Sequence, residues 1–166
     1  MSTKNLYSTE AKEKIKKMAE SIDYAMMATD LKSQPFHAVP MSTKEVDDDG
    51  NIWFLSNKNS THNQHIEKEN KTQLIYADKG NFEFLSIYGR AHISTDRSKI
   101  KELYGSGDDA WFDGEDDPNI TAIKVVPEDA HYWDTKNGKV LSLLKMAQGA
   151  ITGNEPDLGV QGDLKV

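Results

Sequence analysis

The sequence contains no cysteine among its 166 residues. This absence excludes a disulfide scaffold, a thiolate zinc site, a cysteine-ligated iron–sulfur cluster and a cysteine nucleophile. A chain of this length buries roughly two thirds of its unfolded surface, so it needs no covalent or metal staple. We therefore expect one domain held together by its own hydrophobic core.

Cations and long apolar runs are also scarce. Lys and Arg total 20 against 27 Asp and Glu, which gives a formal charge of −7. Because neutralising phosphates needs clustered Lys and Arg, this balance argues against broad nucleic-acid binding. The longest apolar run is Tyr24–Ala28, whereas a membrane-spanning helix needs about 20 apolar residues. The segment Met1–Glu20 is polar, with no apolar signal core, so we expect a soluble cytoplasmic protein without a membrane partner.

Helical periodicity is present near both ends of the chain. Near the N-terminus apolar residues recur at steps of three and four, which predicts an amphipathic helix capped by Ser8 or Thr9. This stripe consists of Ala11, Ile15, Met18, Ala19 and Ile22. A second stripe, which predicts a C-terminal helix, consists of Val140, Leu143, Leu144, Ala147 and Ile151. The polar residues 154–166 are predicted to form a tail that follows a domain over residues 1–153.

The middle of the chain is dominated by strand patterns. Short runs that are apolar on both faces and separated by turn residues predict an antiparallel barrel, closed or nearly closed. The predicted strands are residues 24–29, 36–43, 52–56, 74–77, 82–93, 120–126 and 130–133. Asp49-Gly50 is a strong hairpin signal, and Gly89 predicts a bulge or close packing in the longest strand. Two short helices are expected at residues 60–70 and 96–103.

Three motifs suggest chemistry but are better explained as structure. Gly105–Ala110 spells a dinucleotide fingerprint, yet it follows a helical segment and puts two aspartates where pyrophosphate would lie, so a polar turn is predicted. Asp47 begins a calcium-loop spacing, but a strand follows instead of a helix. His62 and His65 are one helical turn apart and lack the spacing of a metallohydrolase, so no metal site is predicted.

The segment Asn57–Asn63 carries the chemical signal that remains. A buried strand ends here, and Ser60 opens a helix whose central aliphatic residue is Ile66 alone. The first turn of such a helix presents backbone N–H groups without intrahelical partners, which favour an anion, and Lys58 lies close by. The structural alternative is that Ser60 simply caps the helix. The residues alone leave both interpretations open.

The order of these elements and the residues at their joints resemble the general stress protein 26 group of pyridoxamine 5′-phosphate oxidase-like proteins. The resemblance runs from about Ile15 to Leu158 and rests on short fragments that are specific in their order and spacing. These fragments are Tyr24–Thr29, Val39–Met41, Asp49–Phe54, Ser60–His62, Tyr76–Asp78, Gly89–Ala91, Asp96, Trp111–Phe112 with Gly114, Asp117–Pro118 and Tyr132–Asp134. The resemblance implies a mainly β fold with α, namely a six-stranded antiparallel split β-barrel with flanking helices. It also implies a homodimer that holds FMN between its subunits.

The resemblance further implies which residues contact the flavin. The implied FMN-binding residues are Val39, Pro40, Met41, Phe54, Leu55, Ser56, Ser60, Thr61, His62, Asn63 and Trp111. The first six are expected to line or flank the ring system, and the four that begin at Ser60 to face the phosphate. Trp111 is expected to come from the partner subunit. A phosphate at the start of the helix agrees with the anion-site interpretation above.

Departures from the family pattern lead to competing hypotheses. The family arginine before Pro-Met is Val39 here, and the two basic residues after the serine are Thr61 and His62. Each charge-assisted hydrogen bond contributes roughly 1.5–3 kcal/mol, so losing two weakens affinity by about a hundredfold or more. One hypothesis is an FMN-binding general stress protein with oxidoreductase activity on an unknown substrate. The alternative is a non-enzymatic dimeric barrel with weak or lost flavin binding, and a third is a different ligand in the cleft, such as haem or a deazaflavin.

Arginine is too rare for the best-known activity of the wider family. Arg90 and Arg97 are the only arginines, and the C-terminal segment Gly153–Val166 has none. True pyridoxamine phosphate oxidases carry a C-terminal segment with arginine and histidine that grips the substrate. Vitamin B6 oxidation is therefore not predicted, and the sequence assigns no catalytic residue.

Overall fold

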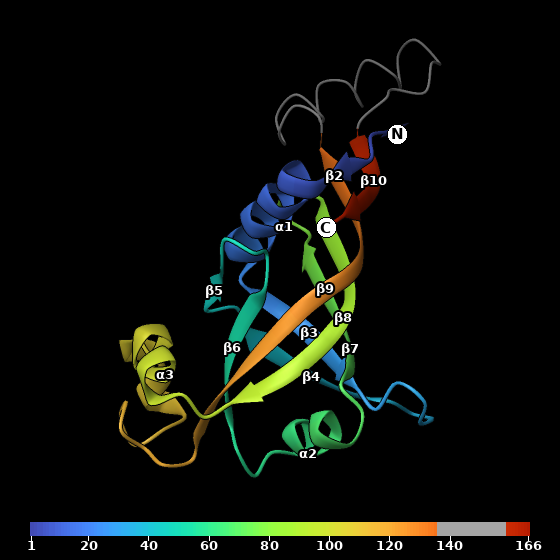
Figure 1. Cartoon of the computed structure of the whole chain (residues 1–166). Helices are drawn as coiled ribbons and strands as arrows, with labels where there is room; N and C mark the ends of the chain where they lie inside the picture. The colour runs from blue at the N-terminus through green and yellow to red at the C-terminus, as the bar shows by residue number, and fades with distance from the viewer. Residues whose placement is uncertain (136–158) are drawn as a thin grey trace.

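The computed structural model describes residues 1–135 and 159–166, in which helices flank one large sheet (Figure 1). The described helices are α1 (Ser8–Ile22), α2 (Thr61–Lys68), α3 (Arg97–Leu103) and the 3₁₀ helix η1 (Ser106–Ala110). The described strands are β1 (Ser2–Thr3), β2 (Leu6–Tyr7), β3 (Tyr24–Thr29), β4 (His37–Ser42), β5 (Glu45–Val46), β6 (Ile52–Asn57), β7 (Lys71–Asp78), β8 (Glu83–Ser94), β9 (Ile120–Thr135) and β10 (Gly159–Lys165). The predicted C-terminal helix containing Val140 lies outside the described residues.

The sheet curls into an incomplete barrel. Strands β6, β9, β8, β7, β3 and β4 follow one another, and each neighbouring pair is antiparallel. In the described part of the chain no hydrogen-bonded ladder joins β4 to β6, so the barrel is open between these two strands. The short strand β5 pairs with β6 around the predicted Asp49-Gly50 turn, where Gly50 has a φ of 85°.

The sheet differs from the predicted six antiparallel strands. It has ten strands in the described ranges, and β1 and β2 pair with β10 in parallel. The two strands predicted at 120–126 and 130–133 form the single strand β9. Gly89 faces Pro127 there, and the register shifts between Tyr88 and Gly89, which confirms the predicted bulge. Because proline cannot donate to a ladder, the irregularity lets both halves of β9 stay paired with β8.

Part of the segment 154–166, which was predicted to be a tail, lies within the described residues and forms a strand. Gly159–Lys165 form β10, which pairs with β9 and buries Leu164 completely. At Gly162 a Cβ atom would lie 2.0 Å from the Lys4 carbonyl oxygen, so a glycine lets the N-terminal segment approach this strand. Pairing with β9 forms this strand, and the local composition gives little sign of it.

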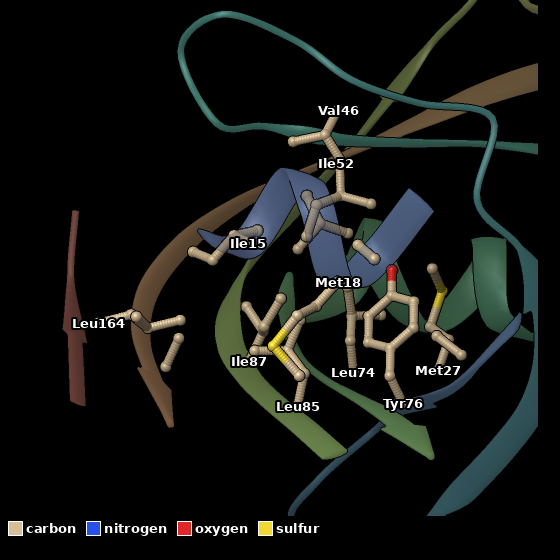
Figure 2. Close-up of a cluster of buried hydrophobic side chains, with 14 of the residues drawn as sticks. Ile15, Met18, Met27, Val46, Ile52, Leu74, Tyr76, Leu85, Ile87 and Leu164 are labelled. Carbon is tan, nitrogen blue, oxygen red and sulfur yellow. The ribbon is translucent and has the colours of Figure 1, made fainter. Parts of the chain in front are cut away.

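Helix α1 covers the barrel with the predicted apolar stripe. Ile15 and Met18 lie in the same buried cluster as Leu85 and Ile87 of β8 (Figure 2). Burying a side chain of this size contributes roughly 1.5–3 kcal/mol, which fixes the helix on the sheet. The predicted cap is wrong, because α1 begins directly after β2 and the residue at its N-cap, Tyr7, makes no side-chain capping bond. Within the described ranges, no helix has the length and hydropathy that a membrane crossing requires.

A second, smaller cluster holds α3 and the segment after it. Its buried members are Leu55, Ile100, Leu103, Ile120 and Ala122. Phe112 packs against this cluster. The cluster therefore fixes the residues after η1 beside β6, where the site described next is found.

Candidate functional site

A pocket of about 310 Å³ opens where the barrel is split. Its walls come from β4 and β6, and the start of α2 and the segment around η1 complete it. The lining residues are Tyr24, Val39, Pro40, Met41, Ser42, Lys44, Leu55, Ser56, Asn57, Ser60, His62, Asp108, Trp111 and Phe112. The pocket thus joins an apolar wall to a polar end formed by serine, asparagine and histidine side chains.

The structure brings most of the predicted flavin contacts together in this lining. Eight of the eleven line the pocket, namely Val39, Pro40, Met41, Leu55, Ser56, Ser60, His62 and Trp111. Phe54 does not, because side chains alternate along β6 and Phe54 is fully buried in the barrel core. Thr61 is exposed outside the lining, and Asn63 is buried behind Ser56. Trp111, which the resemblance assigns to the partner subunit, lines the pocket of its own chain and is 80% exposed.

A hydrogen-bond network organises the polar end. The Thr121 hydroxyl donates to the Ser56 carbonyl oxygen at 3.1 Å, and Thr121 Oγ1 accepts from the Asn63 side-chain amide at 2.8 Å. The Asn63 side-chain oxygen then accepts from the Ser56 hydroxyl at 2.9 Å. Because this hydroxyl has one hydrogen, the 2.6 Å contact between Ser56 Oγ and His62 Nε2 makes His62 the donor. The network therefore orients His62 with its Nε2–H group on Ser56.

His62 also belongs to a group of three histidines. Its ring stacks on His37 with centroids 6.4 Å apart, and His37 meets His65 edge-on at 5.3 Å. Burial, together with the neighbouring His37 and His65, lowers the pKa of His62 to about 4. His62 is therefore neutral near pH 7, and it donates to Ser56 without bringing a positive charge to the pocket. In the described part of the chain no group of three or more His, Asp or Glu side chains is arranged to hold a metal ion.

An ion pair in the lining was missed by the sequence reasoning. Lys44 Nζ lies 2.6 Å from Asp108 Oδ1, and both side chains are largely buried. The other carboxylate oxygen of Asp108 accepts the Gly105 N–H at 2.9 Å. The pair ties η1, and with it Trp111, to the barrel. The predicted polar turn is the 3₁₀ helix η1, but no local pattern indicates its ionic partner, which lies far away in the sequence.

The start of α2 agrees with both interpretations of Ser60. The Ser60 side chain accepts the Asn63 N–H at 3.3 Å and thereby caps the helix, and Ser60 also lines the pocket. The amides of Thr61 and His62 precede the first intrahelical donor, so helix geometry leaves them without an intrahelical partner beside the pocket residue Ser60. Lys58 is not among the lining residues, and its Nζ lies 3.4 Å from the Pro118 carbonyl oxygen.

The residues present fit the two ends of FMN unequally. The apolar wall, with the exposed indole of Trp111 beside it, suits a flat aromatic ring system. The polar end supplies neutral donors from Ser60 and the first amides of α2, because the N–H group of His62 is already bonded to Ser56. Lys44, the lysine in the lining, is paired with Asp108. The lining is therefore compatible with a flat aromatic ring, and it would offer a phosphate group hydrogen bonds alone.

Comparison with known proteins places this fold and pocket in a family. A sequence model of the family described as pyridoxamine 5′-phosphate oxidase like matches residues 10–157. Protein bli-3 of Neurospora crassa is 26% identical over 111 residues, which cover 61% of this chain and 53% of that protein. General stress protein 26 of Bacillus subtilis is 28% identical over 60 residues, which cover 36% of this chain and 43% of that protein. The chain thus spans about half the length of the curated relatives that it matches.

Solved structures are similar over more of the chain. A general stress protein 26 candidate from Jannaschia sp. CCS1 is 25% identical, with a TM-score of 0.76 and coverage of 95% of this chain and 98% of that one. The general stress FMN/FAD binding protein from Xanthomonas citri is 26% identical, with a TM-score of 0.65 and coverage of 76% and 90%. These likenesses support a split-barrel-like fold and confirm the resemblance seen in the sequence. The chain belongs to the pyridoxamine 5′-phosphate oxidase-like family and groups there with the general stress protein 26 homologues.

Proposed function

We propose that this chain is an FMN-binding general stress protein that binds the flavin in the pocket between β4 and β6. The carrying observation is that predicted contacts from three separate segments, represented by Met41, Ser60 and Trp111, converge on one pocket. A bound flavin would supply redox chemistry on a substrate not yet identified, which makes the protein an oxidoreductase. The similarity to a solved FMN/FAD binding stress protein supports this function.

Different residues would contact the ring system and the phosphate of the flavin. Val39, Pro40 and Leu55 would exclude water from the two faces of the ring system, and the exposed Trp111 indole would stack on it. The hydroxyl of Ser60 and the amides at the start of α2 would orient the phosphate. No side chain in the described lining is assigned as a proton donor or acceptor for a substrate.

The proposed protein is a homodimer with the flavin at the subunit boundary. Tyr24, Met26 and Ile75 are 62%, 43% and 48% exposed. Met26 pairs with Ile75 on one side and with Pro40 on the other, so these side chains share one face of the sheet. Tyr24 and Pro40 also line the pocket, which makes the apolar face continuous with it. Contiguous exposed apolar surface of this kind marks an interaction site, and a second copy would cover both face and pocket.

A flavin titration tests the function. We expect purified protein to quench FMN fluorescence and to co-elute with the flavin, and no binding at tens of micromolar would reject the proposal. Trp111→Ala should weaken FMN binding about tenfold, because stacking on one aromatic ring is worth about 1–3 kcal/mol. Tyr7→Ala is the matched control, since Tyr7 is an aromatic residue 60% exposed on β2 and absent from the lining. It should leave the affinity unchanged.

The neutral polar end of the pocket favours the second candidate, a non-enzymatic dimer with weak or lost flavin binding. A colourless preparation that neither binds FMN nor oxidises a nicotinamide, yet runs as a stable dimer, would support this candidate. Flavin-dependent turnover would contradict it. A cytoplasmic location remains a prediction from the sequence under either candidate.

A further inference from the structure

The pocket lining carries no net charge near neutral pH. Three of its side chains can be charged in that range, namely Lys44, His62 and Asp108. Lys44 and Asp108 neutralise each other at 2.6 Å. His62 gives its Nε2–H to Ser56 at 2.6 Å, and burial beside His37 disfavours a second proton on the ring. A dianionic phosphate would therefore meet no unpaired cation from the lining.

Two cations outside the lining, Lys58 and Arg97, contact backbone carbonyl oxygens. Lys58, the lysine nearest in sequence to the start of α2, contacts the Pro118 carbonyl oxygen. Arg97 donates to the carbonyl oxygens of Glu115 and Asp117. The whole chain has a formal charge of −7, which disfavours an anionic ligand at long range. The uncharged lining and the negative charge of the whole chain thus both give no electrostatic attraction for an anionic ligand.

Neutral donors recognise a phosphate weakly. Hydrogen bonds from Ser60 and two helix amides replace hydrogen bonds that the phosphate already makes with water, so the net gain is small. Removing a dianion from water opposes even that gain. The apolar wall of Val39, Met41 and Leu55 has no such cost, because ring burial there is favourable whether or not the ligand carries a phosphate.

We propose that this pocket recognises the ring system of a flavin and not its phosphate, so that it takes riboflavin, the neutral flavin without phosphate, as well as FMN. This inference rests on the proposed function, since it presupposes that a flavin is bound. The pocket does not select for the phosphate because Lys44 is paired with Asp108 and because neutral His62 donates its hydrogen bond to Ser56. The ligand class is a flat aromatic ring with a neutral or anionic ribityl tail.

The test is a titration of the full chain with riboflavin and with FMN, near neutral pH, at low and at high salt. We expect the two dissociation constants to agree within about tenfold. We also expect added salt not to weaken FMN binding, because the phosphate makes no ion pair with the protein that salt could screen. An FMN preference above about a hundredfold, lost at high salt, would overturn the inference and leave the proposed function standing. If neither flavin binds, the proposed function is wrong and the inference falls with it.

A gain-of-charge variant gives a second, independent readout. Thr61 is exposed at the start of α2, so Thr61→Lys adds a cation beside the proposed phosphate position. We expect it to tighten FMN binding about tenfold while leaving riboflavin binding unchanged. Glu67→Gln makes the same change of net charge on the same helix outside the lining, and it should leave the ratio of the two constants as it is. An unchanged ratio in Thr61→Lys would refute the position given to the phosphate.

Discussion

Acidification should destabilise this protein through His62. The folded state lowers the pKa of this residue from 6.5 to about 4, chiefly by burial and also by the neighbouring His37 and His65. Between these two values the unfolded chain binds a proton at position 62 and the folded chain does not. Stability linked to His62 is therefore complete above pH 6.5 and is lost as the pH falls towards 4.

The magnitude follows from the shift. Each unit of pKa difference is worth about 1.4 kcal/mol, so the full shift corresponds to an upper value of about 3 kcal/mol. His62 is partly exposed at the wall of an open pocket, where water screens the charge. Screening reduces the expected loss to about 1–2 kcal/mol.

Urea denaturation of the wild type and of His62→Gln, at neutral pH and near pH 4, measures this loss. Glutamine keeps a donor for Ser56 but takes no proton, so the variant should lose about 1–2 kcal/mol less on acidification than the wild type. His92→Gln is the control, because His92 is exposed on β8, and it should follow the wild type. If His62→Gln loses as much stability as the wild type, His62 is not the group that titrates.

Two further stability predictions, one on packing and one on a buried hydrogen bond, can be checked by the same denaturation assay. Gly89→Ala should lower the free energy of unfolding by about 3 kcal/mol, because the new Cβ would lie 2.2 Å from the Val126 carbonyl oxygen. Gly107→Ala is the control. Its new Cβ would have no atom within 4 Å, so the free energy of unfolding should change by less than about 0.5 kcal/mol. Asn63→Ala should cost about 2 kcal/mol by leaving buried Thr121 without its donor, whereas Gln64→Ala on the exposed face of α2 should be nearly neutral. Equal losses in a variant and its control would contradict the respective contact.

Local patterns predicted the parts of the fold that depend on local chemistry. The stripe of α1 follows from helical spacing, and Ile15 and Met18 are buried as that spacing requires. The bulge at Gly89 follows from a glycine on the buried face of a long strand. In contrast, β10 has two glycines and one fully buried aliphatic residue, Leu164, and its pairing with β9 decides its structure. Such a strand is formed by tertiary contacts, which a reading of local sequence does not contain.

The candidate site likewise has features that depend on adjacent residues and features that depend on contacts between distant segments. Ser60 was predictable, because the cap of a helix is a property of adjacent residues. The ion pair of Lys44 with Asp108, and the stacking of His37 on His62, join segments that only the folded barrel brings together. The electrostatics of the pocket are set by these long-range contacts, so the sequence could suggest residues that lie together in the lining but gave no sign that Lys44 is already paired.

Pro40 links the open barrel to the pocket. It lies in the middle of β4, opposite Met26 of β3, and a proline there must direct its nitrogen away from the paired side of the strand. The other side of β4 is the edge that faces the split, where the missing N–H group removes a donor from any ladder with β6. Closing the barrel would therefore leave an acceptor on β6 without a partner. Since Pro40 also lines the pocket, the residue that removes this donor from β4 also contributes to the apolar surface exposed by the split.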